Sequence, residues 1–149
     1  FAHANISHIL FNMIGLFFFG VQIERRVGST EFLVFYLVTG ILAGVFSLLV
    51  YWFSGSQQVF LLGASGAVFA VLLAFATFFP RSMIYLFGIL PIRAPILVLG
   101  YTAIEIVSGF MGRSGVAHLT HLAGFGFAYI YMLIRYRINP IQVFLEDYR

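Results

Sequence analysis

Residues 59–79 read VFLLGASGAVFAVLLAFATFF, an uncharged apolar run with a single serine, Ser65, set among small residues. A hydroxyl group and two glycines are costly inside a lipid bilayer, and polar groups at that depth tend to be functional or to hold helices together. Ser65 is therefore the first candidate functional residue of the chain, and its segment is a candidate membrane helix.

The composition of the 149 residues assigns the chain to a lipid bilayer. Hydrophobic residues make up 62% and charged residues 9%, whereas a soluble domain contains about 45–50% and about 25%, respectively. All eight basic residues are arginines that lie between the apolar segments and form no basic patch, so we predict no nucleic-acid partner. The absence of cysteine excludes disulfides, thiolate metal ligands and a thiol nucleophile.

Five apolar segments of helical length follow one another along the chain. No alternation of polar and apolar residues indicates a barrel, so we predict an all-α, multi-pass transmembrane helical bundle. The polar stretch 24–31 is expected to end the first helix at Gly28 and to cap the second with Ser29 or Thr30. The linker 80–94 predicts no single element. The predicted spans are residues 6–23, 32–53, 63–79, 95–110 and 116–134.

The arginines orient this predicted single membrane domain, residues 1–149, and its polar tail, residues 135–149. One side of the membrane receives only Arg113, and the other seven arginines fall on the opposite side, which is cytoplasmic by the positive-inside rule. The tail is then cytoplasmic, and the conspicuous polar residues near the helix ends face outward. These outward residues are His3, His8, Ser65, His118 and His121.

Small residues at helical spacing are expected to bring Ser65 and His121 together. Rows of small residues let two membrane helices approach closely, so the Ser65 hydroxyl and the His121 imidazole are predicted to reach hydrogen-bond distance. His8 and Asn12 share a face of the first helix and, with the Ser65 amide, are predicted to form an oxyanion hole. The two rows are Gly66, Ala70 and Ala74, and Ala117, His121, Gly124 and Ala128.

These motifs together resemble those of the rhomboid intramembrane serine proteases. The tetrapeptide 63–66 resembles the family's GxSG motif, residues 3–12 resemble the His/Asn signature of its second helix, and residues 117–124 resemble its last-helix histidine motif. The resemblance covers the chain from the second family helix to the sixth. We expect the chain to be an N-terminally truncated fragment that lacks the family's first helix and the membrane-embedded loop after it. Ala128 stands where a glycine is usual.

The resemblance implies an intramembrane serine endopeptidase that cleaves transmembrane protein substrates without a cofactor or metal. It makes Ser65 the nucleophile and His121 the general base and acid, with His8, Asn12 and the Ser65 amide as the oxyanion hole. We expect a prokaryotic cell membrane, with the active site toward its outer face. The supporting residues that it implies are His3, Gly63, Gly66 and Glu24.

Two other classes of function stay open at this point. The four histidines, as the pairs His3 with His8 and His118 with His121, would suit a metal-binding membrane protein or haem carrier, although no HExxH motif accompanies them. An inactive relative that binds transmembrane helices is the other alternative. We interpret His118 as structural and Glu105 as neutral or hydrogen-bonded within the bundle. We expect no aspartate to orient His121, so that the serine and histidine pair lacks a third member.

Overall fold

The computed structural model describes residues 6–54, 64–86, 88–111 and 115–147, and all their side chains except those of residues 6–8, 110 and 115–117. The described chain is mostly helical, and five helical segments occupy the five predicted spans. A π-helical turn, η1, joins α1 to α2, and a second one, η2, extends α6. The elements are α1 (Ile6–Gly15), η1 (Leu16–Gly20), α2 (Val21–Val27), α3 (Ser29–Phe53), α4 (Ser65–Phe78), β1 (Met83–Leu86), β2 (Leu90–Arg93), α5 (Ala94–Phe110), α6 (Gly115–Tyr131), η2 (Met132–Tyr136) and α7 (Pro140–Asp147).

Among the described residues, one helix, α3, combines the length and the hydropathy that a membrane crossing requires. Helix α4 and the Ala94–Gly109 part of α5 are apolar but shorter. The helical character of the bundle is therefore confirmed, whereas the number of membrane crossings stays a prediction.

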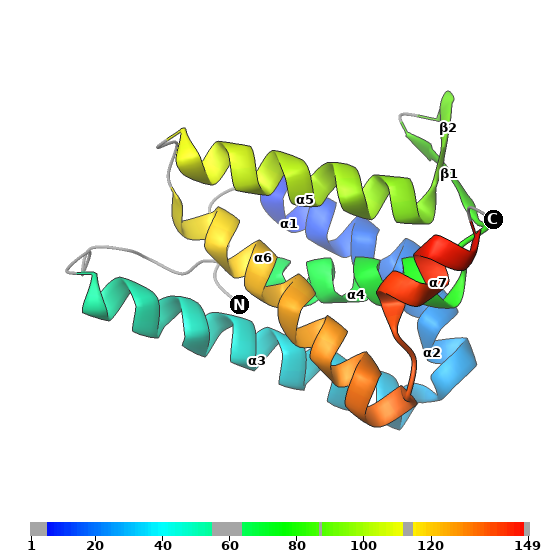
Figure 1. Cartoon of the computed structure of the whole chain (residues 1–149), viewed down its shortest axis with the longest axis horizontal. Helices are drawn as coiled ribbons and strands as arrows, with labels where there is room; N and C mark the ends of the chain where they lie inside the picture. Colours follow the sequence, from blue (N-terminus) through cyan, green and yellow to red (C-terminus); the bar gives the residue numbers. More distant parts are fainter. Residues whose placement is uncertain (1–5, 55–63, 87, 112–114, 148–149) are drawn as a thin grey trace.

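Helix α4 is the centre of the bundle. Eleven of its fourteen residues are buried, and Figure 1 shows α4 in the middle, with α3 below it, α1 and α5 above it and α6 crossing it. Four of these buried residues are alanines, of which Ala70, Ala74 and Ala76 are fully buried. Such small side chains let several helices pack closely around one, so the Ser65 end of α4 is enclosed on several sides.

Helices α1 and α2 run beside α4 in the same direction. A Cβ atom built on Gly15 would lie 3.1 Å from Val68, and the rings of Phe19 and Phe75 are 4.9 Å apart. At the far end, the guanidinium group of Arg26 lies 5.0 Å from the Phe78 ring. Successive contacts therefore advance along both helices together, and the beginnings of α1 and α4 lie at the same end of the bundle.

The turn between α2 and α3 corrects the predicted cap. Gly28 ends α2 as predicted, but it is also the N-cap of α3, with φ at 91°. Glycine takes this conformation without the penalty that other residues incur. Neither Ser29 nor Thr30 is the cap, because α3 begins at Ser29, whose hydroxyl instead donates to Glu24 Oε1 at 2.6 Å.

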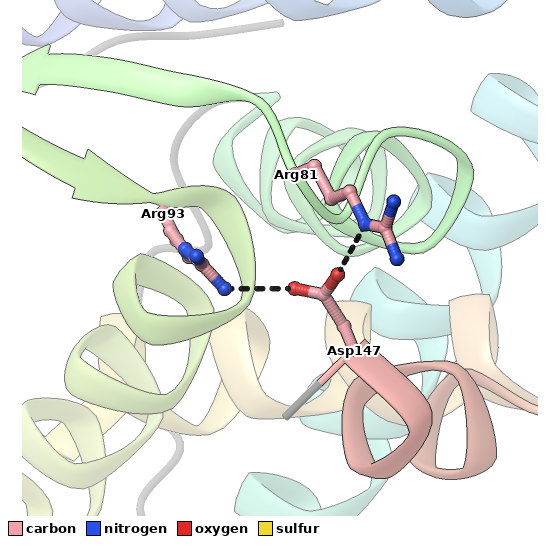
Figure 2. A network of polar contacts seen from close by, with 3 residues as sticks. All are labelled: Arg81, Arg93 and Asp147. Carbon is pink, nitrogen blue, oxygen red and sulfur yellow. Dashed lines mark hydrogen bonds and ion pairs between the residues drawn. The ribbon is translucent and has the colours of Figure 1, made fainter. Parts of the chain in front are cut away.

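The linker and the predicted tail form structure that the sequence did not indicate. Strands β1 and β2 pair as an antiparallel hairpin, and most of the tail is α7, whose Phe144 is buried in the core. Figure 2 shows the Asp147 carboxylate between two arginines that flank the hairpin, at 2.9 Å from Arg81 Nε and 3.4 Å from Arg93 Nη1. These contacts fix the end of the chain to the base of the hairpin.

Candidate active site

The site begins at a contact between the backbones of α4 and α6. A Cβ atom on Gly124 would overlap the carbonyl oxygen of Gly66 and lie 2.9 Å from its carbonyl carbon, and a Cβ atom on Gly66 would lie 3.1 Å from Thr120. Only glycine at position 124 permits this approach, and a Cβ atom at position 66 would require its neighbours to shift by a few tenths of an ångström. The predicted close packing of the two small-residue rows is therefore confirmed, with Ser65 directly before Gly66 and His121 one turn before Gly124.

The His121 imidazole lies against an aromatic ring of α4 and a carboxylate of α5. Its ring stacks on Phe69 with 4.1 Å between centroids and 5° between planes, and its Nδ1 atom lies 3.1 Å from Glu105 Oε1. Phe69 follows Ser65 by four residues and so shares its face of α4. The imidazole therefore lies against the helical turn that begins at Ser65, and Ser65 itself is buried.

Glu105 brings a carboxylate close to His121, for which we expected no aspartate and no third member of the pair. Its side chain, on α5, places Oε2 2.5 Å from His118 Nδ1 and Oε1 3.1 Å from His121 Nδ1. The interpretation of Glu105 as hydrogen-bonded within the bundle is confirmed. The sequence did contain a signal for this contact, because α5 and α6 are consecutive helices joined by a short connection. Residues at similar distances along the chain from that connection lie at the same level of the helix pair. Residue 105 precedes the connection, and residues 118 and 121 follow it.

Asn12 is a buried amide with an unused donor. It is 6% exposed, and its Nδ2 atom has no hydrogen-bond partner among the described residues. Gly15 of α1 packs against Val68 of α4, and the two helices run parallel. Asn12 lies one turn before Gly15, and Ser65 lies one turn before Val68. Asn12 and Ser65 are thereby brought to the same end and the same level of the bundle.

The other predicted site residues are not brought to Ser65 within the described structure. His8 lies in α1 one turn before Asn12, but its side chain is outside the described residues, as are His3 and Gly63. Glu24 lies near the end of α2, close to Arg26, which contacts Phe78 at the opposite end of α4 from Ser65. Its described contact is with Ser29, in the turn between α2 and α3.

The histidines and carboxylates of the described residues form no group of three or more with the geometry to hold a metal ion. His118 and His121 both turn Nδ1 toward the Glu105 carboxylate. The Glu105 carboxylate thus lies near two imidazoles of α6, and Ser65 lies on the adjoining helix α4.

Comparison with known proteins gives one consistent result. The Rhomboid domain model matches residues 1–138. The chain is 36% identical over 135 residues to RHOMBOID-like protein 12, mitochondrial, of Arabidopsis thaliana, covering 80% of this chain and 40% of that protein. It is 34% identical over 91 residues to Rhomboid protein 1, mitochondrial, of Saccharomyces cerevisiae, covering 58% of this chain and 25% of that protein.

A bacterial relative gives a similar alignment. The chain is 29% identical over 147 residues to Rhomboid protease AarA of Providencia stuartii, covering 82% of this chain and 48% of that protein. The chain thus spans less than half the length of each of these three relatives. No solved structure matches it significantly. The domain match over most of its length shows that the chain belongs to the rhomboid family.

Proposed function

We propose that the chain carries the active site of an intramembrane serine endopeptidase, with Ser65 as nucleophile and His121 as general base and acid. The observation that supports this most strongly is the position of the His121 ring. The ring stacks on Phe69, which follows Ser65 by one turn of α4, and its Nδ1 atom lies beside the Glu105 carboxylate. The rhomboid family contains such proteases, and the relative in Providencia stuartii is named as one.

The proposed reaction is acyl transfer through Ser65. His121 takes the hydroxyl proton as Ser65 Oγ bonds to the carbonyl carbon of the scissile peptide, and it then gives that proton to the departing amine as the C–N bond breaks. His121 next takes a proton from water as the water oxygen bonds to the acyl carbon of the ester. The bond between that carbon and Ser65 Oγ then breaks, His121 returns the proton to Oγ, and the acid product leaves. The pair acts without an aspartate in the usual third place.

The proposed oxyanion hole uses groups near the beginnings of α1 and α4. Ser65 is the first residue of α4, and the first amide groups of a helix have no partner within it. The Asn12 amide supplies a buried donor that has no partner among the described residues, and His8 lies one turn before it. Donors arranged in advance at such a place stabilise the negative charge that develops on the carbonyl oxygen.

The substrates that we propose are transmembrane segments of other proteins. Rhomboid proteases act on membrane proteins within the bilayer. A regular helix hides its carbonyl groups from attack, so the segment should contain a small or helix-breaking residue near the cleaved bond. The catalytically inactive, helix-binding alternative would have the same preference without cleavage.

Family membership makes the chain an integral membrane protein. Two of the three relatives above are named mitochondrial, so the expected prokaryotic cell membrane is not supported. We propose that the chain crosses its membrane five times, with Ser65 near the non-cytoplasmic or equivalent face. The arginine-rich end of the bundle then lies on the other side. The contacts of Arg26, Arg81 and Arg135 are at that end.

The orientation is tested with single cysteines in this cysteine-free chain, expressed in the plasma membrane of bacterial cells. Ser56→Cys, which lies outside the described residues, should react with a membrane-impermeant thiol reagent added to intact cells. Ser82→Cys, at the base of the hairpin, should react only after the membrane is opened. Rapid reaction of Ser82→Cys in intact cells would invert the proposed orientation.

The activity is tested with a serine-reactive fluorophosphonate and a model transmembrane substrate, each applied to the full parent protein. We expect labelling and cleavage by the wild type, and loss of both in Ser65→Ala and His121→Ala, because each removes one member of the reacting pair. Thr77→Val is the matched control, since Thr77 is buried near the opposite end of α4 from Ser65 and its hydroxyl donates to the Leu73 carbonyl of the same helix. Absence of labelling in folded wild type would favour the inactive helix binder.

A further inference from the structure

We propose that Glu105 is a positioning residue for His121, so that the proposed serine and histidine work with a carboxylate supplied by α5. This inference rests on the proposed function of Ser65 and His121. It departs from the expectation that the pair lacks an acidic third member, and it arises from the position of the Glu105 side chain, which contacts two histidines of α6.

Both oxygens of this carboxylate are engaged. Oε1 lies 3.1 Å from His121 Nδ1, at ion-pair distance, and Oε2 lies 2.5 Å from His118 Nδ1. Glu105 is 7% exposed, so water contributes little to its solvation. His118 therefore holds one oxygen of the carboxylate while the other is presented to His121.

The two contacts of the His121 ring fix different degrees of freedom. Stacking on Phe69 sets the plane of the imidazole, and the contact of Nδ1 with Glu105 sets which edge of the ring turns toward α5. The 3.1 Å contact is at ion-pair distance but does not have the geometry of a hydrogen bond in this structure. A carboxylate beside Nδ1 nevertheless favours the tautomer with its proton there and leaves Nε2 as the nitrogen that can accept a proton from Ser65. Rotation of the ring about its bond to Cβ would lose the carboxylate contact.

The charge of Glu105 gives the contact a role in the reaction itself. When His121 accepts the proton, it becomes an imidazolium ion within 3.1 Å of the carboxylate, and opposite charges attract more strongly in a medium of low dielectric constant than in water. A carboxylate within a membrane bundle is costly on its own, which is why such residues are functional candidates. The contact is then stronger in the transition state than in the resting enzyme.

Few other ionisable groups lie near the Glu105 carboxylate on the side of a neighbouring cavity. Glu105 and His118 line a cavity of about 320 Å³ between α3, α5 and α6, and of the described residues that line it, Tyr51 is the remaining one with an ionisable group. The other lining residues are apolar, namely Ile106, Gly109, Leu119 and Leu122. The histidines are thus the nearest partners for the carboxylate charge on this side.

The experiment compares Glu105→Gln with Glu105→Asp in the full parent protein, by cleavage kinetics with a transmembrane substrate. Glutamine keeps the size and one oxygen but removes the charge, so we expect kcat to fall about 10²-fold with KM nearly unchanged. Aspartate keeps the charge on a shorter side chain and should restore part of that loss. Thr102→Val is the matched control, because it removes a hydroxyl that donates to the Val98 carbonyl on the same helix.

A kcat for Glu105→Gln within about twofold of wild type, or an aspartate variant no better than the glutamine variant, would overturn the inference while leaving the Ser65 and His121 proposal intact. Absence of fluorophosphonate labelling in the folded wild type would instead contradict the proposed function itself. If the variants fail to fold, ¹⁵N NMR of the wild-type histidines decides the matter. Neutral His121 should carry its proton on Nδ1, and a proton on Nε2 would overturn the inference.

Discussion

The two ends of the bundle treat polar side chains in opposite ways. At the end where α4 begins, Ser65, Asn12 and Glu105 are all buried. At the opposite end, carboxylates meet arginines that reach the solvent, as in the pair of Arg81 with Asp147, in which the arginine side chain is 87% exposed and the aspartate side chain 4%. Burial of polar groups costs free energy unless they are well paired, whereas exposed ion pairs contribute little. The difference is consistent with the proposal that the first end carries the chemistry, whereas the charge pairs of the second end hold segments in place.

Gly124→Ala, at the Ser65 end of the bundle, is expected to have the largest effect on stability and cleavage. Its Cβ atom would overlap the Gly66 carbonyl group, so α6 must move away from α4 and carry His121 with it. We expect unfolding in detergent to become easier by about 1–3 kcal/mol and cleavage to fall below about 1% of wild type, because a displacement near 1 Å can cost about 10²-fold in rate.

Gly126→Ala is the control for this prediction. Gly126 lies two residues further along α6, and a Cβ atom there would meet nothing within 4 Å. Its replacement should leave both thermal unfolding and cleavage close to wild type. Equal losses in the two variants would show that α6 resists alanine for reasons other than its contact with α4.

A smaller effect, confined to the rate, is expected from Asn12→Ala. If the amide serves the developing oxyanion, its removal should lower kcat about 10–10²-fold with KM nearly unchanged, since other donors remain. Its Nδ2 has no hydrogen-bond partner among the described residues, so stability in a thermal melt should hold or rise slightly. A drop in stability with kcat preserved would make Asn12 a structural residue and blur the contrast between the two ends.

The sequence predicted the features that depend on hydropathy and short-range spacing. The five apolar stretches of the sequence predicted where the five helical segments lie, because lipid favours helices whose backbone groups are paired internally. The spacing of Gly66 and Gly124 within rows of small residues predicted the contact between α4 and α6, since only such rows permit backbones to touch. Both features follow from a single segment or from a pair of matching segments.

Features that depend on how helices are rotated and connected were missed. Helix α5 is apolar on most sides, so its sequence does not tell which face carries Glu105 toward α6. The hairpin of β1 and β2 has strands of four residues, too short for a clear alternating pattern. The cap at Gly28 was missed because serine and threonine are the more frequent N-caps, while here the positive φ angle decides for glycine.

The smallest effect is expected from Asp147→Asn at the arginine-rich end. The substitution removes the charge that contacts Arg81 and Arg93 (Figure 2). Both arginines remain partly solvated, so the loss in unfolding free energy should not exceed about 1 kcal/mol, and added salt should shrink it further. Cleavage should stay at the wild-type level, as it should in the control Glu146→Gln, whose side chain is exposed. Loss of cleavage in Asp147→Asn alone would show that the tail acts on the distant Ser65 end, and the two ends would then be coupled rather than specialised.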